Sequence, residues 1–131
     1  NGRRFNHEEC GEHYYRALAS WAVLQSLTGL KADMPREKLS FSPALPELIA
    51  PWFLPGAYGK LIVAENKIRI ECLDGCLNLK QLALRTEMEK AVVTVGGAAA
   101  CTQTYENGVL TLTFSDGLQL CSGSFILATK F

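Results

Sequence analysis

Residues Asn6–Leu30 read NHEECGEHYYRALASWAVLQSLTGL, and this stretch decides how the rest of the chain is interpreted. Its first half, up to Arg16, holds most of the side chains that could take part in chemistry, and its second half carries no charge. The pattern predicts one long helix over about Glu9–Thr28, with a polar start and a buried body. A helix that is apolar nearly all round packs on more than one side. We therefore expect some of its neighbours to come from outside this chain.

The polar start of the predicted helix brings together candidate binding residues. Residues three, four and seven positions apart share one face of a helix, so Glu9, His13 and Arg16 would project together, with Glu12 on the same side. The alternative is a charged first turn, in which the helix dipole stabilises the acidic side chains. His7, His13 and a glutamate could ligate a metal, but two histidines are poor evidence and we predict no metal site.

The same stretch is similar to a known family. The chain carries the ordered pattern E-C-G-x-H-Y-x-R-A-x-A-S-W over residues 9–21, then Pro35-Arg36, and then L-S-F-S-P over residues 39–43. This pattern resembles the C-terminal part of glycoside hydrolase family 116, which contains the non-lysosomal glucosylceramidases and related β-glucosidases. The match is dense over about Asn6–Pro43 and looser beyond.

The resemblance implies a six-hairpin (α/α)6 barrel with retaining β-glycosidase chemistry, in which this chain supplies one of the last helices. It implies that Arg16 and Glu9 bind sugar hydroxyls, with His13 and His7 beside them as further substrate-binding candidates. His7 stands where the family has an acid. The nucleophile and the acid/base carboxylate would lie outside these residues, so we assign no catalytic residue and expect the chain alone to be inactive.

Composition narrows the possible partners and compartments. The chain has 131 residues, with 13 basic and 13 acidic side chains. This balance leaves no electrostatic footprint for nucleic acid or an anionic membrane. No apolar run approaches the roughly 18 residues of a membrane span. The chain begins at Asn1 without a methionine, which suggests a fragment or a processed chain.

The cysteines and the glycine turns give no sign of a cofactor. The five cysteines lack the spacing of a disulfide framework. We predict that most are free and buried, which favours a reducing compartment and a cytoplasmic location. A Cys72–Cys76 bridge across a hairpin is the less favoured alternative. Gly96-Gly97 and Asp116-Gly117 lack the strand–loop–helix setting of a phosphate loop, so we predict no cofactor.

The remaining pattern divides the chain into three parts. Residues 1–34 would be the helical segment that completes a barrel, and residues 35–57, which hold all five prolines, a connector. Residues 58–131 alternate with period two and have turns such as Asp74-Gly75, which predicts six to eight antiparallel strands. A bulge near Lys80-Gln81 would bring the leucines on either side into phase. The expected fold class is α+β, with an N-terminal long helix from the barrel end and a C-terminal antiparallel β-sandwich-like domain.

Three functions are compatible with these patterns. The first is the C-terminal piece of a β-glycosidase, with a β-glycoside as substrate. Its partner would be the remainder of the barrel, or a second copy bound through the apolar helix around Trp21 and Val23. The second is a stand-alone β-sandwich module that binds carbohydrate or protein, which an exposed row of aromatic side chains would favour. The third is a structural domain that only caps a barrel.

Overall fold

The computed structural model describes residues 22–95 and 101–131. Residues 22–28 are helical, and we call them the 22–28 helix. The nine strands and one short 3-10 turn of the described residues are, in chain order, β1 (Lys31–Asp33), η1 (Met34–Arg36), β2 (Lys38–Phe41), β3 (Leu48–Leu54), β4 (Ala57–Ala64), β5 (Lys67–Arg85), β6 (Ala91–Val95), β7 (Cys101–Glu106), β8 (Val109–Cys121) and β9 (Phe125–Lys130).

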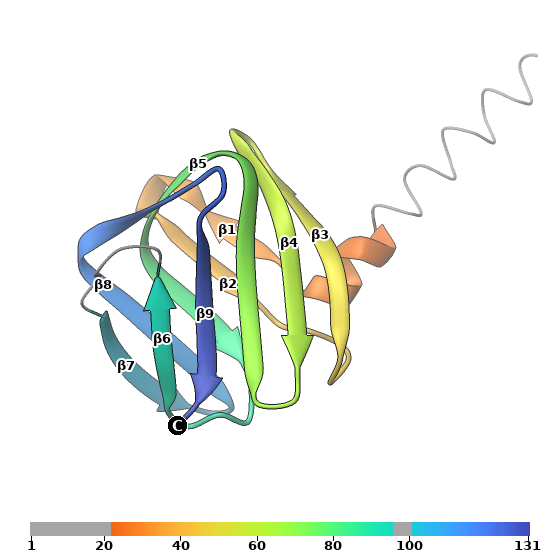
Figure 1. Cartoon of the computed structure of the whole chain (residues 1–131), viewed down its shortest axis with the longest axis vertical. Helices are drawn as coiled ribbons and strands as arrows, with labels where there is room; N and C mark the ends of the chain where they lie inside the picture. Colours follow the sequence, from red (N-terminus) through yellow and green to blue (C-terminus); the bar gives the residue numbers. More distant parts are fainter. Residues whose placement is uncertain (1–21, 96–100) are drawn as a thin grey trace, which may run out of the picture.

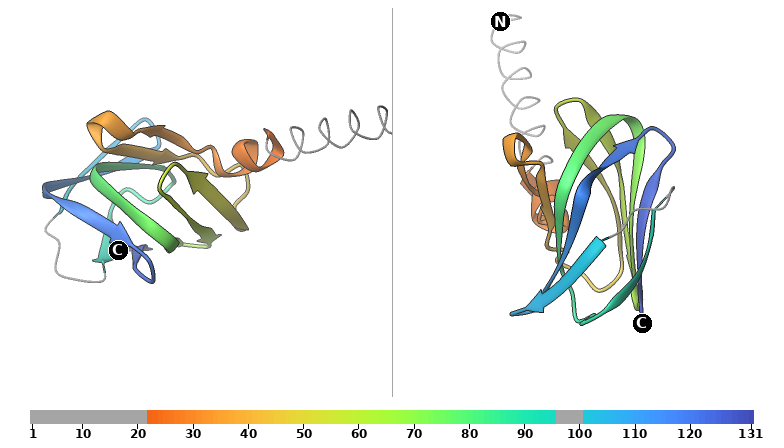
Figure 2. Two further views of the ribbon diagram at one scale, coloured as in Figure 1. Left: turned by 90° about the horizontal axis from the view of Figure 1, so that it is seen from above. Right: turned by 90° about the vertical axis from the view of Figure 1, so that its left-hand side faces the viewer.

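The strands form one curled sheet organised around β5 (Figure 1). The first part of β5 pairs with β4 and β9, and these continue outward to β3 and β6. The second part of β5 pairs with β8 and β2, which continue to β7 and β1. Figure 2 shows the two halves facing each other as layers, with β5 and β8 curving over one end. The long strand therefore belongs to both layers.

The core fills the space between the two halves of the sheet. Alternate residues of β5 point inward, as the buried Ile68 and Ile70 show for the first half and Leu82 and Leu84 for the second. The register between β5 and β8 shifts between Leu79 and Gln81, which confirms the predicted bulge. The largest fully buried side chains are Trp52, Phe41, Phe114, Leu39, Leu61, Ile70, Leu79, Leu82, Leu84, Leu110, Leu112 and Leu120.

The predicted α+β fold class, a long helix followed by an antiparallel sandwich-like domain, is wrong. The described residues are mostly strand, and their helical content is the 22–28 helix and η1. The sheet is also not purely antiparallel, because residues Lys38–Phe41 of β2 run parallel to Gln81–Leu84 of β5. The part of the predicted helix before Ala22 lies outside the described residues.

The prolines explain why the sequence analysis did not predict β2 and β3. Pro51 lies within β3, whose pairing in the described residues is with β4 alone. Proline is tolerated in such an edge strand because no ladder hydrogen bond is needed from it there. Ala50 and Trp52 on either side of it face the core. Residues 35–57 therefore supply β2 and β3 to the sheet, where the sequence indicated an irregular connector.

The prediction that the cysteines are mostly free is wrong for the pair Cys76 and Cys121, which form a disulfide between β5 and β8. The two residues lie directly opposite each other in the ladder, with their Cα atoms 4.1 Å apart. The Cys72–Cys76 alternative is excluded, because Cys72 is a free, buried thiol. Gly75, with φ +87°, lies within β5, which continues through it, so Asp74-Gly75 is not the hairpin turn that the sequence predicted.

A side chain also links β6, an outer strand of the first half of the sheet, to β7, an outer strand of the second half. The side-chain amide of Gln103 on β7 accepts a hydrogen bond from the backbone nitrogen of Ala91 on β6, at 3.1 Å. It donates another to the Ala91 carbonyl oxygen, at 2.7 Å. One side chain thus takes the place of a ladder pair between the strands.

No helix of the described residues has the length and apolar character needed to cross a membrane.

Candidate functional site

The sequence-predicted substrate-binding residues His7, Glu9, His13 and Arg16 all lie outside the described residues. The described part closest to them in sequence is the 22–28 helix, where the helix predicted from about Glu9 ends. We therefore built the candidate site from the junction between this helix and the sheet, since that junction fixes where the helix ends.

Backbone hydrogen bonds attach the end of the 22–28 helix to the chain that follows β2. Gly29 adopts the left-handed conformation, with φ +60°, and its nitrogen donates to the Gln25 carbonyl oxygen at 2.7 Å. The nitrogen of Ser42 donates to the carbonyl oxygen of Thr28, and the nitrogen of Ala44 donates to that of Leu27, both at 2.9 Å. The last carbonyls of a helix have no partner within it. Here Ser42 and Ala44, from the β2–β3 connection, donate hydrogen bonds to these carbonyls and hold the helix end in place.

Thr28 is the buried polar residue of this junction. Its side chain is 2% exposed, and its hydroxyl donates to the Leu24 carbonyl oxygen at 3.0 Å. The same hydroxyl oxygen accepts a longer hydrogen bond from the Leu30 nitrogen, at 3.4 Å. A buried hydroxyl without a partner is unfavourable by about 1–3 kcal/mol. Both contacts of Thr28 stay within the turn that ends the helix, so they stabilise that turn.

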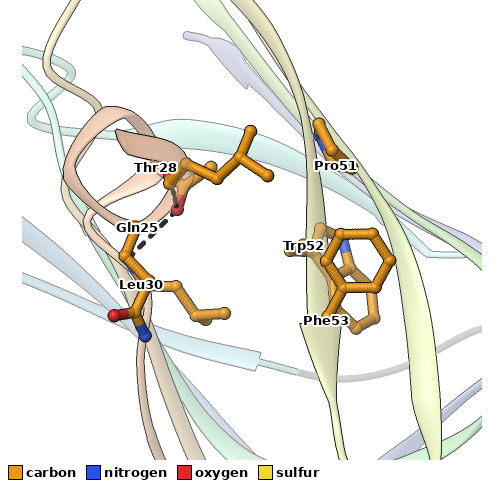
Figure 3. A pocket seen from close by; sticks show the side chains of 7 residues that line it. Gln25, Thr28, Leu30, Pro51, Trp52 and Phe53 are labelled. Carbon is orange, nitrogen blue, oxygen red and sulfur yellow. Dashed lines mark hydrogen bonds between the residues drawn. The ribbon is translucent and has the colours of Figure 1, made fainter. Parts of the chain in front are cut away.

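A small cavity separates the helix from β3 (Figure 3). Its volume is about 20 Å³, room for roughly one water molecule. Figure 3 shows Leu30 extending from the helix side toward Trp52 and Phe53. Trp52 is 1% exposed, and its indole nitrogen has no hydrogen-bond partner among residues 22–95 and 101–131. The cavity is too small for a sugar. The junction between the described residues is therefore a packing contact that positions the end of the helix.

An aromatic pair lies on the outer face of the first half of the sheet. Phe53 on β3 and Tyr58 on β4 are directly opposite each other, and their rings stack with centroids 6.0 Å apart and planes at 27°. Their exposed fractions are 41% and 44%. The sequence interpretation missed this pair because Phe53 was placed in the connector. The alternation of buried and exposed residues over Leu48–Leu54 was the signal that could have found it.

Charged residues continue this outer face. Glu71 on β5 lies between Lys60, at 3.6 Å, and Arg69, at 2.7 Å. The Arg69 guanidinium also lies 4.0 Å from the centre of the Phe125 ring. Cation–π contacts of this kind order both side chains. These contacts use the charges of Lys60, Arg69 and Glu71 within the protein, which favours a structural role for the three residues.

The free thiols of the described residues are not activated nucleophiles. Burial raises the pKa of the Cys72 thiol, and it does the same for Cys101. A raised pKa keeps both thiols protonated near neutral pH, whereas nucleophilic cysteines are thiolates. In residues 22–95 and 101–131, no three His, Cys, Asp or Glu side chains gather closely enough to hold a metal ion.

Comparison with known proteins does not identify this chain, since no protein-family model and no curated protein matches it.

Proposed function

We propose that this chain is the C-terminal part of a retaining β-glycosidase of the glucosylceramidase and β-glucosidase type. In this proposal the curled sheet holds the end of a helix whose start binds the sugar. The observation that carries the proposal is the ordered motif over residues 9–21, which combines an acid, an imidazole and a guanidinium at helical spacing. The motif ends directly before the 22–28 helix.

Each motif residue has a chemical role in this proposal. The planar fork of Arg16 offers five donors, which suit adjacent sugar hydroxyls. Glu9 holds the fork in place and accepts from a hydroxyl, while His13 and His7 contact the same ring. Contacts that strengthen in the transition state raise the rate. The two carboxyl groups that retaining hydrolysis needs, about 5–5.5 Å apart, come from outside this chain.

The junction with the sheet supports this role by fixing one end of the helix. The hydrogen bonds from Ser42 and Ala44 to the last helical carbonyls set both its position and its direction. The partner in this proposal is the remainder of the catalytic barrel, or a second copy of the chain. Val23 on the 22–28 helix is 57% exposed and offers apolar surface to such a partner. Trp21, the other residue of the expected patch, lies outside the described residues.

A second candidate function is a carbohydrate-binding module without catalysis. The stacked pair of Phe53 and Tyr58 favours it, because flat aromatic rings on a β-face can pack against the apolar face of a sugar.

The proposed location follows from the cysteines. The cytoplasmic location expected from the sequence rested on free thiols. The Cys76–Cys121 disulfide favours an oxidising compartment instead, since such bonds are rare in reducing ones.

Turnover of an aryl β-glucoside tests the proposal. The full-length protein that contains this chain should hydrolyse p-nitrophenyl β-glucoside with retention of configuration, whereas the 131-residue chain alone should show no turnover. Absence of β-glycosidase activity in the folded full-length protein would refute the proposal. Activity of the isolated chain would refute the assignment of the catalytic carboxylates to other residues. Sugar binding by the inactive chain that is lost in Tyr58→Ala would support the second candidate.

A further inference from the structure

A wide groove opens at the end of the curled sheet where the β4–β5 turn and the last residue lie, at the lower edge of Figure 1. Its volume is about 700 Å³. This lies within the range of roughly 300–1,000 Å³ that is typical of small-molecule sites. The groove is bounded by the β2–β3 connection, the β4–β5 turn, the residues after β5, the β7–β8 hairpin and Lys130.

The groove has an apolar floor and one aromatic wall. Ile68 and Met88 close it toward the core, and both are buried. Leu45, which is 48% exposed, adds apolar surface at the rim. The Tyr105 ring lines the wall, and its hydroxyl donates to the Thr86 carbonyl oxygen at 3.0 Å. This hydrogen bond holds the partly exposed ring in position, so a flat apolar surface is already in place for a ligand.

Charged side chains of both signs surround this apolar surface. Lys67, Arg85 and Lys130 are basic, and Glu65 and Glu87 are acidic. None of the five takes part in the ion pairs found within the described part of the chain. Elsewhere in the described residues charges do pair, as Arg36 does with Asp33 at 2.8 Å. The groove thus presents donors and acceptors that form no ion pair with another described residue, around one apolar floor.

We infer that this groove binds a neutral oligosaccharide at a site without catalytic function. A sugar hydroxyl both donates and accepts hydrogen bonds, so it can use the cations and the carboxylates together. The C–H face of a pyranose ring packs against Tyr105 and Leu45. An anionic ligand could pair with the three cations but would leave the carboxylates of Glu65 and Glu87 without donors. A wholly apolar ligand would remove charged groups from water without replacing their hydrogen bonds. The inference does not depend on the glycosidase motif.

The test is a titration of the 131-residue chain with oligosaccharides, in which binding is detected from shifts of the backbone amide NMR signals. The probes are cellopentaose, laminaripentaose, maltopentaose and xylopentaose, with dodecanoate as an anionic amphiphile for comparison. We expect at least one pentasaccharide to shift the amides of Asn66, Thr86 and Gly108, which line the groove. Dodecanoate should bind more weakly than that sugar.

Two substitutions of one residue separate the ring from its hydroxyl. Tyr105→Phe keeps the aromatic surface but removes the hydrogen bond that holds the ring, so it should raise Kd by less than Tyr105→Ala does. Tyr105→Ala removes the surface and should raise Kd about tenfold or more. If Tyr105→Ala does not fold, the exposed Leu45→Asp serves instead and should weaken binding as well. Leu73→Ala, which removes an exposed apolar side chain of β5 that does not line the groove, is the matched control and should leave Kd unchanged.

Three results would overturn the inference. The first is the absence of shifts with all four pentasaccharides. The second is sugar binding that Tyr58→Ala abolishes and Tyr105→Ala does not, which would place the site at the outer aromatic pair. The third is tighter binding of dodecanoate than of any sugar. None of these results bears on turnover by the full-length protein, so the glycosidase proposal fails or stands separately.

Discussion

Replacing Gly29 with alanine should detach the helix end from the sheet. Gly29 has φ +60°, a region where an L-residue is disfavoured by about 1–2 kcal/mol. An added Cβ would also clash with the Ser42 carbonyl oxygen and lie 2.6 Å from the Ser42 Cβ. No side-chain rotation relieves a contact with backbone, so residue 42 has to move away.

That movement sets the size of the effect. It breaks the hydrogen bond from Ser42 to Thr28 and the one from Ala44 to Leu27, both of 2.9 Å. Each contributes about 1 kcal/mol. Together with the conformational strain, Gly29→Ala should therefore lower the free energy of unfolding of the 131-residue chain by about 3–4 kcal/mol. Urea denaturation followed by circular dichroism measures this loss.

Gly123 provides a matched control. Its φ is +82°, but nothing lies within 4 Å of an added Cβ. Gly123→Ala should therefore show the conformational strain alone, a loss of about 1–2 kcal/mol. The amides of Ser42 and Ala44 should exchange hydrogen faster in Gly29→Ala and at the normal rate in Gly123→Ala. Equal losses of stability in the two variants, with unchanged exchange, would refute the attachment of the helix through these bonds.

Three further predictions concern the disulfide, the Gln103 side chain and the buried Cys72 thiol. The double variant Cys76→Ser, Cys121→Ser should lose about 4 kcal/mol of unfolding free energy in urea, because the bridge joins residues 45 apart in sequence; a loss below about 1 kcal/mol would contradict this. Gln103→Leu should lose about 1–3 kcal/mol, since it removes both bonds to Ala91. Gln103→Glu, which keeps only the acceptor, should fall between Gln103→Leu and the unaltered chain, and equal stability of all three would exclude the link. Iodoacetamide at pH 7.5 should label Cys72 far more slowly in the folded chain than in urea, because burial raises its pKa; equal rates by peptide mass spectrometry would contradict this.

The sequence predicted those parts of the fold that depend on local patterns. The alternation over Lys67–Leu73 marks the first half of β5, and two leucine pairs out of phase revealed the bulge at Leu79 and Gln81. Each signal is a property of neighbouring residues. Gly29, whose left-handed conformation ends the 22–28 helix, is a local stop signal that the sequence analysis did not use.

Pairing between distant segments could not be predicted in the same way. The prolines of residues 35–57 led to the prediction of a connector in place of β2 and β3. The residues around Lys38–Phe41 carry no pattern that indicates parallel pairing of β2 with the second half of β5. Cys76 and Cys121 meet because of the β5–β8 register, which neither local sequence specifies. The groove is lined by five segments that are separate in the sequence, so no single segment indicates that a groove forms. The predicted sugar-binding residues remain a prediction from the motif.

The most direct test of the central claim is the kinetics of Arg16→Lys in the full-length protein. Lysine keeps the charge but loses the planar fork that would bind two hydroxyls. If the helix start binds the sugar, kcat/KM for an aryl β-glucoside should fall roughly ten- to a hundred-fold, equivalent to about 1.5–3 kcal/mol, with Tm nearly unchanged. A folded Arg16→Lys protein with unchanged kcat/KM, or one whose only change is a lower Tm, would contradict the claim and leave Arg16 as a structural ion-pair partner.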